Sequence, residues 1–194
     1  QTNLLVDCGM IQGEQFTDNN NYDPFAFDPA TINYTLITHA HIDHCGRIPR
    51  LVREGFTGKI VSTHATLDLA YLMLEDSAHV IQLDAELAGY PPLYTVDDVM
   101  ATAELFHGVN YHEVQTLGDF TVEFFDAGHV LGSAFIKISA GGKTIVFSGD
   151  LGNPPVPLLP PTESLPATDY LVMASTYGQR AHEPSRERKL LLSS

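Results

Sequence analysis

The sequence predicts an α/β protein in which helices pack in layers against mixed β-sheets. Two patterns carry this prediction: short apolar, β-branched runs alternate with helical patterns in the first half, and β-like runs dominate the second half. The chain has 194 residues, of which 44% are hydrophobic and 18% are charged. It is therefore long enough for one sizeable core and has the composition of a folded globular protein, so one domain is the default expectation.

Strands and helices alternate in the first half. A helix is expected from about residue 46 to residue 54, because Gly55 suits a left-handed C-cap. A second helix begins near Thr95, where Thr95 and Asp98 fit a capping box. Between them, from Thr66, apolar residues recur at the spacing of a long amphipathic helix, namely Leu67, Ala70, Tyr71, Leu74, Ala78 and Ile81. The predicted strands each end in a small or polar residue and cover 3–7, 34–38 and 59–63.

The second half of the sequence is predicted to form mostly β-strands. Gly141 and Gly142 supply a hairpin turn between two of its predicted strands. Residues 153–166 contain six prolines, which suggests an extended connector across the surface, with a domain linker as the alternative. The strands predicted in this half cover 120–125, 134–138, 143–147 and 169–173.

Composition narrows the classes of protein and of partner. No stretch approaches the roughly 20 uninterrupted apolar residues of a membrane span, so no membrane partner is expected. Two cysteines, Cys8 and Cys45, do not suggest a disulfide framework, and a cytoplasmic setting is expected. The formal net charge of −14 counts against a simple nucleic-acid binder, although bound divalent cations would add local positive charge.

The run from residue 39 to residue 44 has the features of a metal site. His39, His41, Asp43 and His44 lie in a predicted turn between a strand and a helix, where successive side chains fan around a small volume. Imidazole nitrogens and carboxylate oxygens are the ligands that hold catalytic Zn²⁺ while leaving a position open for water. His39 and His41 share one direction, and Asp43 and His44 can serve a neighbouring ion. The spacing therefore predicts a site for two metal ions.

Three further residues are candidates for the same site. His129 and Asp150 each follow a predicted strand and have glycine close by, which is where a rigid scaffold presents functional side chains. Each is equally compatible with an ordinary turn. Asp7 ends the first predicted strand and could orient a metal-bound imidazole by a hydrogen bond, although a plain turn aspartate is an equal alternative.

The other histidines lack ligand-like spacing. We expect packing, capping or surface roles for four of them and leave His182 open. The four are His64, His79, His107 and His112.

The run from residue 39 to residue 44 resembles the H-x-H-x-D-H signature of the metallo-β-lactamase superfamily in full. The resemblance implies that superfamily's αββα sandwich, two Zn²⁺ ions and hydrolytic chemistry. It also implies that the first ion is held by His39, His41 and His129. The second ion would be held by Asp43, His44 and a bridging Asp150. The redox flavodiiron branch resembles the superfamily but has the pattern H-x-E-x-D. This branch is disfavoured because position 41 is His where that pattern has Glu.

Three more segments look like the β-CASP branch of that superfamily. They are residues 6–13, 127–133 and 175–178. This branch processes nucleic acids and includes the endonuclease subunit of the cleavage and polyadenylation machinery and ribonuclease J. The resemblance implies a metallo-β-lactamase-type domain across 1–179, with 180–194 as a tail or the start of a truncated β-CASP-like region.

Two departures from the β-CASP pattern affect the expected function. The branch has an acid before its Ser-Thr-Tyr-Gly run, where this sequence has Ala174. The chain also ends at Ser194, before the β-CASP domain and its later histidines, and it opens without the usual first pair of strands. We therefore expect the fold to be incomplete at both ends.

The resulting expectation is a zinc-dependent hydrolase that cleaves phosphodiester bonds in RNA with a metal-bridged hydroxide. Asp43 and Asp150 would be its catalytic residues and would orient the nucleophile. The alternatives are a general hydrolase of small esters or β-lactams, and a metal-binding module with weak catalysis. Because uncovered sheet edges tend to pair with another chain, self-association into a homo-oligomer is also expected.

Overall fold

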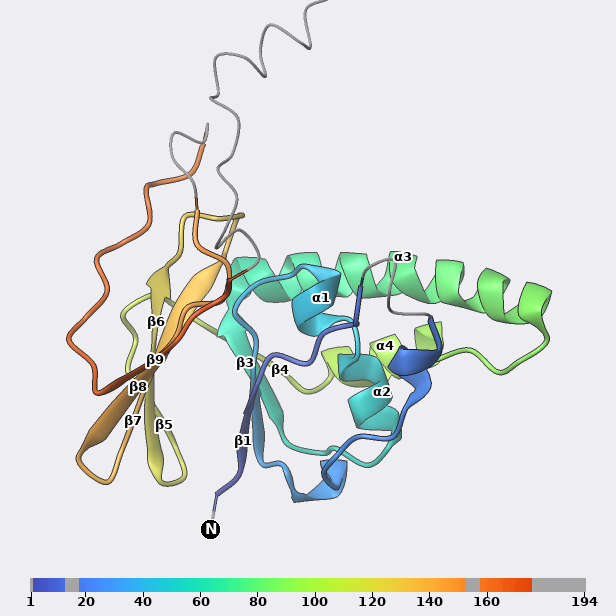
Figure 1. Ribbon diagram of the computed structural model, residues 1–194, viewed down its shortest axis with the longest axis horizontal. Helices are drawn as coiled ribbons and strands as arrows, with labels where there is room; N and C mark the ends of the chain where they lie inside the picture. Colours follow the sequence, from blue (N-terminus) through green and yellow to red (C-terminus); the bar gives the residue numbers. More distant parts are fainter. Residues whose placement is uncertain (1, 13–17, 153–157, 176–194) are drawn as a thin grey trace, which may run out of the picture.

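The computed structural model describes residues 2–12, 18–152 and 158–175, which form two β-sheets with helices on one side (Figure 1). The first sheet has the order β1-β2-β3-β4 and is parallel throughout. Its strands are β1 (Leu4–Val6), β2 (Tyr34–Leu36), β3 (Lys59–Thr63) and β4 (Phe106–Val109). The second sheet has the order β5-β6-β7-β8-β9 and is antiparallel except for the parallel pair β8 and β9. Its strands are β5 (Gln115–Leu117), β6 (Phe120–Asp126), β7 (Ala134–Ala140), β8 (Lys143–Phe147) and β9 (Tyr170–Val172).

The helices begin and end at residues that satisfy their terminal backbone groups. The Thr63 hydroxyl accepts a hydrogen bond from the Thr66 N–H, so the long helix starts two residues before the Thr66 predicted from sequence. It ends at Gly89, which has φ 76°. The capping box predicted at Thr95 and Asp98 is confirmed. The helices are α1 (Ile42–Cys45), α2 (Ile48–Arg53), α3 (His64–Ala88) and α4 (Val96–Ala103), with short 3₁₀ helices at Asp18–Tyr22 and Pro29–Thr31.

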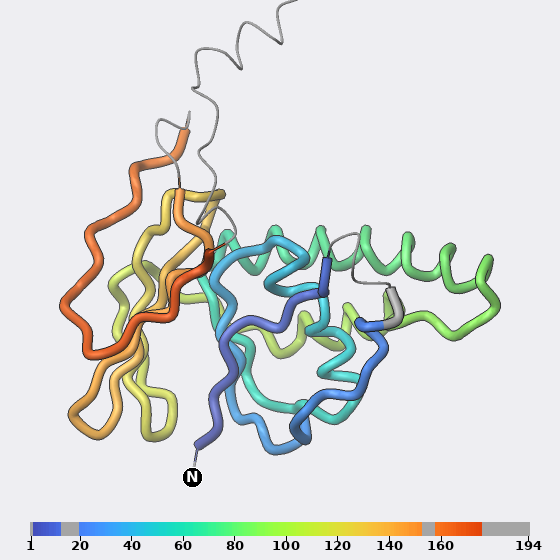
Figure 2. Tube along the Cα trace, viewed as in Figure 1, coloured from blue at the N-terminus to red at the C-terminus, as the bar shows by residue number. Residues whose placement is uncertain are grey.

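The core lies in two layers, one on each face of the first sheet. Ile60 and Val61 are adjacent in β3 and fully buried, yet they belong to different clusters, because successive strand residues point to opposite faces. Ile60 packs among side chains of the helices, and Val61 packs against Phe124 and Ile136 of the second sheet. The parallel sheet is thus covered on both faces, as is usual for this class of sheet. Figure 2 shows the same division, with the helical half and the second sheet side by side.

The strands predicted from sequence are confirmed to within a few residues at their ends. The Gly141 and Gly142 hairpin is also confirmed, with φ 56° and 75°, the positive values that a type I′ turn requires. Apart from the two 3₁₀ helices, three described elements were not predicted: α1, β4 and β5. Each has only three or four residues, and β4 contains His107 and Gly108 rather than a β-branched run, so neither length nor periodicity marks them.

The proline-rich connector runs along the second sheet where the structure describes it. Residues 158–168 form no helix or strand. Thr162 donates a hydrogen bond to the Ala127 carbonyl at 2.8 Å, and the Glu163 N–H donates to the Asp126 carbonyl at 3.0 Å. These bonds tie this stretch to the end of β6, which agrees with a connector that crosses the surface.

All four α-helices of the described residues lie on the side of the first sheet (Figure 1). In the described ranges the outer face of the second sheet carries a small cluster of Ala127, Phe135 and Val146 and no helix, so three layers of the expected αββα sandwich are seen. The boundary expected between residues 179 and 180 lies outside the described residues. Every helix that the structure describes is too short or too polar to span a bilayer.

Candidate metal centre

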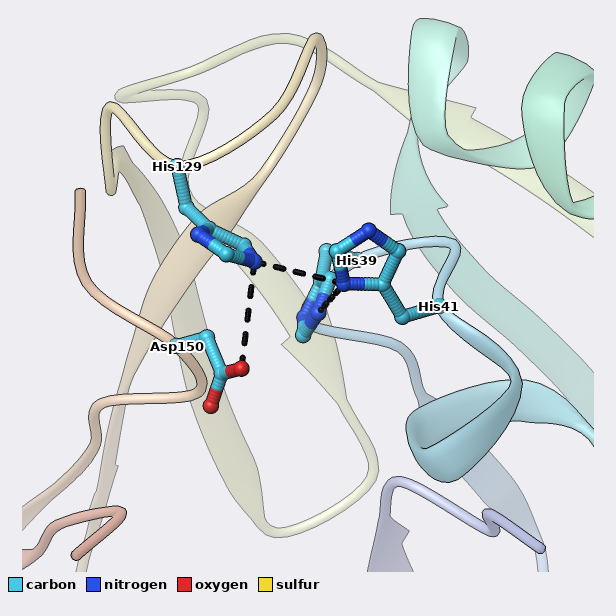
Figure 3. A group of neighbouring side chains, drawn as sticks. All are labelled: His39, His41, His129 and Asp150. Atoms are coloured by element: carbon cyan, nitrogen blue, oxygen red, sulfur yellow. Dashed lines mark hydrogen bonds and ion pairs between the residues drawn. The ribbon is translucent and has the colours of Figure 1, made fainter. Parts of the chain in front are cut away.

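The six predicted ligands come from three loops that converge where β2, β6 and β8 end. The loop after β2 leads through His39 and His41 into α1, which carries Asp43 and His44. His129 follows β6 and Asp150 follows β8, so the two sheets contribute to one site. Figure 3 shows His39, His41, His129 and Asp150 pointing toward a common point.

Three imidazoles form the first ligand group. His39 Nε2 lies 3.0 Å from His41 Nδ1, and His129 Nε2 lies 3.3 Å from that same nitrogen. Nitrogens bound to one tetrahedral Zn²⁺ would be about 3.3 Å apart, given the usual Zn–N bond lengths. A carboxylate oxygen of Asp150 lies within 4.8 Å of the ligand atoms of all three. The donor set and its spacing therefore fit a zinc ion.

The protonation state of these imidazoles also suits a metal. Burial, with added repulsion from His44, His41 and His129, lowers the pKa of His39 to about 2. Burial likewise lowers the pKa of His129. Both rings are neutral near pH 7, and the neutral imidazole is the form that ligates metal.

A second ligand group shares Asp150 with the first. Asp43, His44 and Asp150 offer ligand atoms within 4.8 Å of one another. His44 Nε2 lies 3.8 Å from Asp43 Oδ2 and 3.6 Å from Asp150 Oδ1, whereas Asp150 Oδ2 lies 3.8 Å from His129 Nε2. One oxygen of Asp150 thus faces each group, which is the geometry of a carboxylate that could bridge two ions.

Asp7 forms a hydrogen bond with His44 of the second group on the ring nitrogen that faces away from Asp43 and Asp150. Its Oδ2 lies 2.7 Å from His44 Nδ1 and accepts the Thr38 hydroxyl at 2.8 Å, and its Oδ1 accepts the Thr38 N–H at 2.8 Å. Burial lowers the pKa of His44, but the hydrogen bond and charge of Asp7, with the charges of Asp43 and Asp150, outweigh burial and raise it. A proton on His44 Nδ1 that is held by Asp7 leaves Nε2 facing Asp43 and Asp150.

Thr38 connects the two groups. Because its hydroxyl donates to Asp7, its oxygen is available to accept the Nδ1–H of His39, 3.1 Å away. That bond leaves the lone pair of His39 Nε2 directed at His41 and His129. Thr38 was not among the residues predicted for the site, although its place directly before His39 at a strand end is a signal for such a role.

A network of hydroxyls fixes the loop that carries His129. Thr63 and Thr66, at the start of α3, both donate to the Gly132 carbonyl, at 2.7 and 2.8 Å. The Ser133 hydroxyl accepts the His129 N–H at 3.0 Å. Gly132 has φ 81°, and a Cβ there would lie 2.5 Å from the Thr66 nitrogen, so glycine is required. Sequence reasoning missed both threonines, whose partner is more than 60 residues away.

The segment after β1 packs directly against α1. Cys8 N–H and Met10 N–H donate to the His44 and Ile42 carbonyls, at 2.8 and 2.9 Å. A Cβ on Gly9 would lie 1.6 Å from the Asp43 carbonyl oxygen. Only glycine therefore allows the two backbones to approach this closely, and this contact fixes the turn that carries Asp43 and His44.

The histidines without ligand-like spacing lie outside both ligand groups. All four are exposed, and one of them, His112, pairs with Glu163 at 3.2 Å. His182 lies outside the described residues. Both cysteines are free thiols, and burial raises the pKa of Cys8 and of Cys45 to about 12, so neither offers a thiolate near neutral pH.

Comparison with known proteins agrees with this fold and this arrangement of side chains. The sequence matches the Metallo-beta-lactamase superfamily over residues 1–191, and the chain belongs to that superfamily. Among solved structures, a mutant metallo-β-lactamase with a HARLDQ motif from Cronobacter sakazakii superposes with a TM-score of 0.51 and 23% identity. The match covers 80% of this chain and 56% of that one and supports the fold alone.

Within the superfamily, the relatives include proteins named ribonuclease or endoribonuclease and a cleavage and polyadenylation specificity factor, which confirms the predicted resemblance to the β-CASP RNA-processing branch. The chain is 39% identical over 184 residues to Ribonuclease TTHA0252 of Thermus thermophilus. It is 31% identical over 188 residues to Cleavage and polyadenylation specificity factor 73 of Drosophila melanogaster, and 30% identical over 195 residues to Endoribonuclease YSH1 of Kluyveromyces lactis. These matches cover 95–96% of this chain but only 40%, 27% and 25% of the respective relatives.

Proposed function

We propose that this chain is the metal-binding part of a two-zinc hydrolase that cleaves phosphodiester bonds in RNA. The observation that carries the proposal is the pair of ligand groups that share Asp150. Nitrogen and carboxylate donors at this spacing suit zinc. When bound, two Zn²⁺ ions would lower the pKa of a water molecule and neutralise charge on phosphate oxygens.

Each of the six candidate ligands would have a defined role at the two ions. His39, His41 and His129 would hold one ion, and Asp43 and His44 would hold the other. Asp150, with one oxygen toward each group, would hold both and keep their separation fixed. The side chains of Asp43 and Asp150 are 47% and 28% exposed, so both carboxylates would be close enough to solvent to orient an attacking water molecule, and the second oxygen of Asp43 could accept its proton.

The names of the relatives support RNA as the substrate class. Three proteins that match nearly the whole of this chain are named as a ribonuclease, an endoribonuclease and a cleavage and polyadenylation specificity factor. Because the chain spans less than half of each, an RNA-binding groove formed with further residues is part of the proposal. The net charge of −14 makes local positive charge at the metal centre necessary for phosphate binding.

A second candidate function follows from Ala174. This residue is exposed, and its N–H donates to the Ser148 hydroxyl at 3.1 Å. Because position 174 is alanine, the acid of the β-CASP pattern is absent there. Its absence favours a centre that binds metal but cleaves RNA slowly, or a centre that hydrolyses small esters or β-lactams. Cleavage of nitrocefin or nitrophenyl esters, with labelled single-stranded RNA left intact, would favour this alternative.

The experiment is an RNA cleavage assay on protein purified without chelators. With zinc present, the chain should cleave labelled single-stranded RNA, and His41→Ala should abolish cleavage and lower the zinc content. His79→Ala is the matched control, because His79 is exposed and belongs to neither ligand group. Cleavage that persists in His41→Ala would mean that the activity does not come from this site.

A further inference from the structure

The longest helix, α3, is apolar on two opposite sides. Its inward side packs against the rest of the helical half through buried Leu67, Ala70, Leu74 and Ala78, and Ala85 is buried near its end. A second set of large apolar side chains on the same helix is 41–88% exposed, comprising Leu72, Met73, Val80, Leu83 and Leu87. Single exposed apolar residues are common, but a row of them along one helix is not. In Figure 2 the helix lies along one border of the molecule.

The exposed residues form one continuous stripe. At 100° of rotation per residue, the five side chains fall within a sector of about 100° that faces away from the buried side. Met73, Val80 and Leu87 repeat every seven residues, and Leu83 lies three residues after Val80. This alternation of three and four residues is the spacing by which one helix contacts another along a seam. The stripe therefore fits a helical partner.

The charge on α3 decides what kind of helix fits. The helix contains five acidic residues and neither Lys nor Arg, and the third acid, Asp76, lies within the stripe. None of the five forms an ion pair with a described residue. A second copy of the chain would place the same acids opposite these and would bury Asp76 without a cation, which is unfavourable.

We propose that the outer stripe of α3 docks an amphipathic helix of a partner protein whose apolar seam is flanked by Lys or Arg. The apolar seam would supply the contact area, and a basic residue opposite Asp76 would pair with the carboxylate inside the interface. None of the five stripe residues belongs to a ligand group of the metal centre. The proposal is therefore independent of the proposed hydrolase activity.

The probe is a synthetic amphipathic helix with a Leu seam and Lys flanks, titrated against the full chain and followed by fluorescence anisotropy. It should bind at least about tenfold more tightly than the same seam with Glu flanks, or than a Lys-rich peptide of scrambled sequence. Val80→Glu and Leu83→Glu should each weaken binding by about tenfold or more. Because both substitutions add negative charge, pure charge attraction would instead strengthen it.

The matched control is Val114→Glu, an exposed valine outside α3. It adds the same charge and should leave the affinity unchanged, and circular dichroism should show equal helix content in all variants. Equal binding of the scrambled Lys-rich peptide would overturn the proposal. So would a dimer in light scattering that dissociates in Leu83→Glu, since a second copy would then be the occupant.

Discussion

Replacing Asp7 by Asn removes the acceptor oxygen that contacts both His44 Nδ1 and the Thr38 hydroxyl. Asp7 has φ 56°, and Asn tolerates a left-handed backbone, so the turn should be kept. The amide has only one acceptor oxygen. If that oxygen accepts the Thr38 N–H, the NH₂ group faces His44 Nδ1 and selects the tautomer that carries its proton on Nε2. In that tautomer Nε2 has no lone pair for a metal.

The expected magnitude follows from the role of such partners. Loss of a hydrogen-bonding partner behind a metal-bound histidine typically weakens metal affinity by about 10–100-fold, or roughly 1.4–2.8 kcal/mol. Asp7 pairs directly with His44 of the second group at 2.7 Å, whereas its connection to the first group runs through the Thr38 hydroxyl to His39. The larger loss should therefore fall on the zinc position held by His44.

Competition titration with a chromogenic zinc chelator measures the two affinities separately. Asp7→Asn should weaken one zinc by about 10–100-fold and leave the other within about threefold. The matched control is Asp84→Asn, which removes a carboxylate from an exposed position on α3 and should change neither affinity. Two zinc ions bound by Asp7→Asn with unchanged affinities would refute this account of Asp7.

The remaining predictions concern the parts that hold the centre in place. Thr66→Val removes one of the two hydroxyls that donate to the Gly132 carbonyl. It should lower the free energy of unfolding, measured with denaturant, by about 0.5–1.5 kcal/mol and weaken zinc affinity. Gly9→Ala places a Cβ 1.6 Å from the Asp43 carbonyl oxygen, so it should displace α1 and lower the zinc content measured by mass spectrometry. Removal of zinc with EDTA should lower the melting temperature. Zinc at a hundred times its Kd should then raise the free energy of unfolding by about 2.7 kcal/mol.

Each of these has an outcome that contradicts it. Thr121→Val, at an exposed hydroxyl on β6, is the control for Thr66→Val, and equal effects of the two would show that the Gly132 contact is unimportant. Full zinc occupancy in Gly9→Ala would contradict the required close approach. A melting temperature that does not depend on zinc would show that zinc does not bind the folded chain in preference to the unfolded chain.

Local patterns allowed much of the fold and most of the candidate ligands to be predicted from sequence. The run from 39 to 44 holds four candidates within six residues, so spacing alone suggested a metal site. The capping box at Thr95 and Asp98 is equally local, since its bonds join residues three positions apart. Features of this kind depend on a few neighbouring residues, and periodicity or motif spacing is enough to recognise them.

What could not be predicted depends on contacts between distant segments. Asp7 was compatible with a plain turn, and only its contact with His44, 37 residues away, distinguishes the two interpretations. The contacts of Thr63 and Thr66 with Gly132 span 69 and 66 residues. The apolar spacing of α3 correctly indicated a buried side but hid a second apolar side, because both sets of residues contribute to the same average hydrophobicity.

The central claim is that Asp150 is shared by two zinc positions, and zinc stoichiometry tests it most directly. Protein purified without chelators and measured by plasma mass spectrometry should contain two zinc ions per chain. Asp150→Ala should weaken both positions, whereas His129→Ala and Asp43→Ala should each weaken one. A chain that binds no zinc, or one whose two zinc ions are unaffected by Asp150→Ala, would contradict the account.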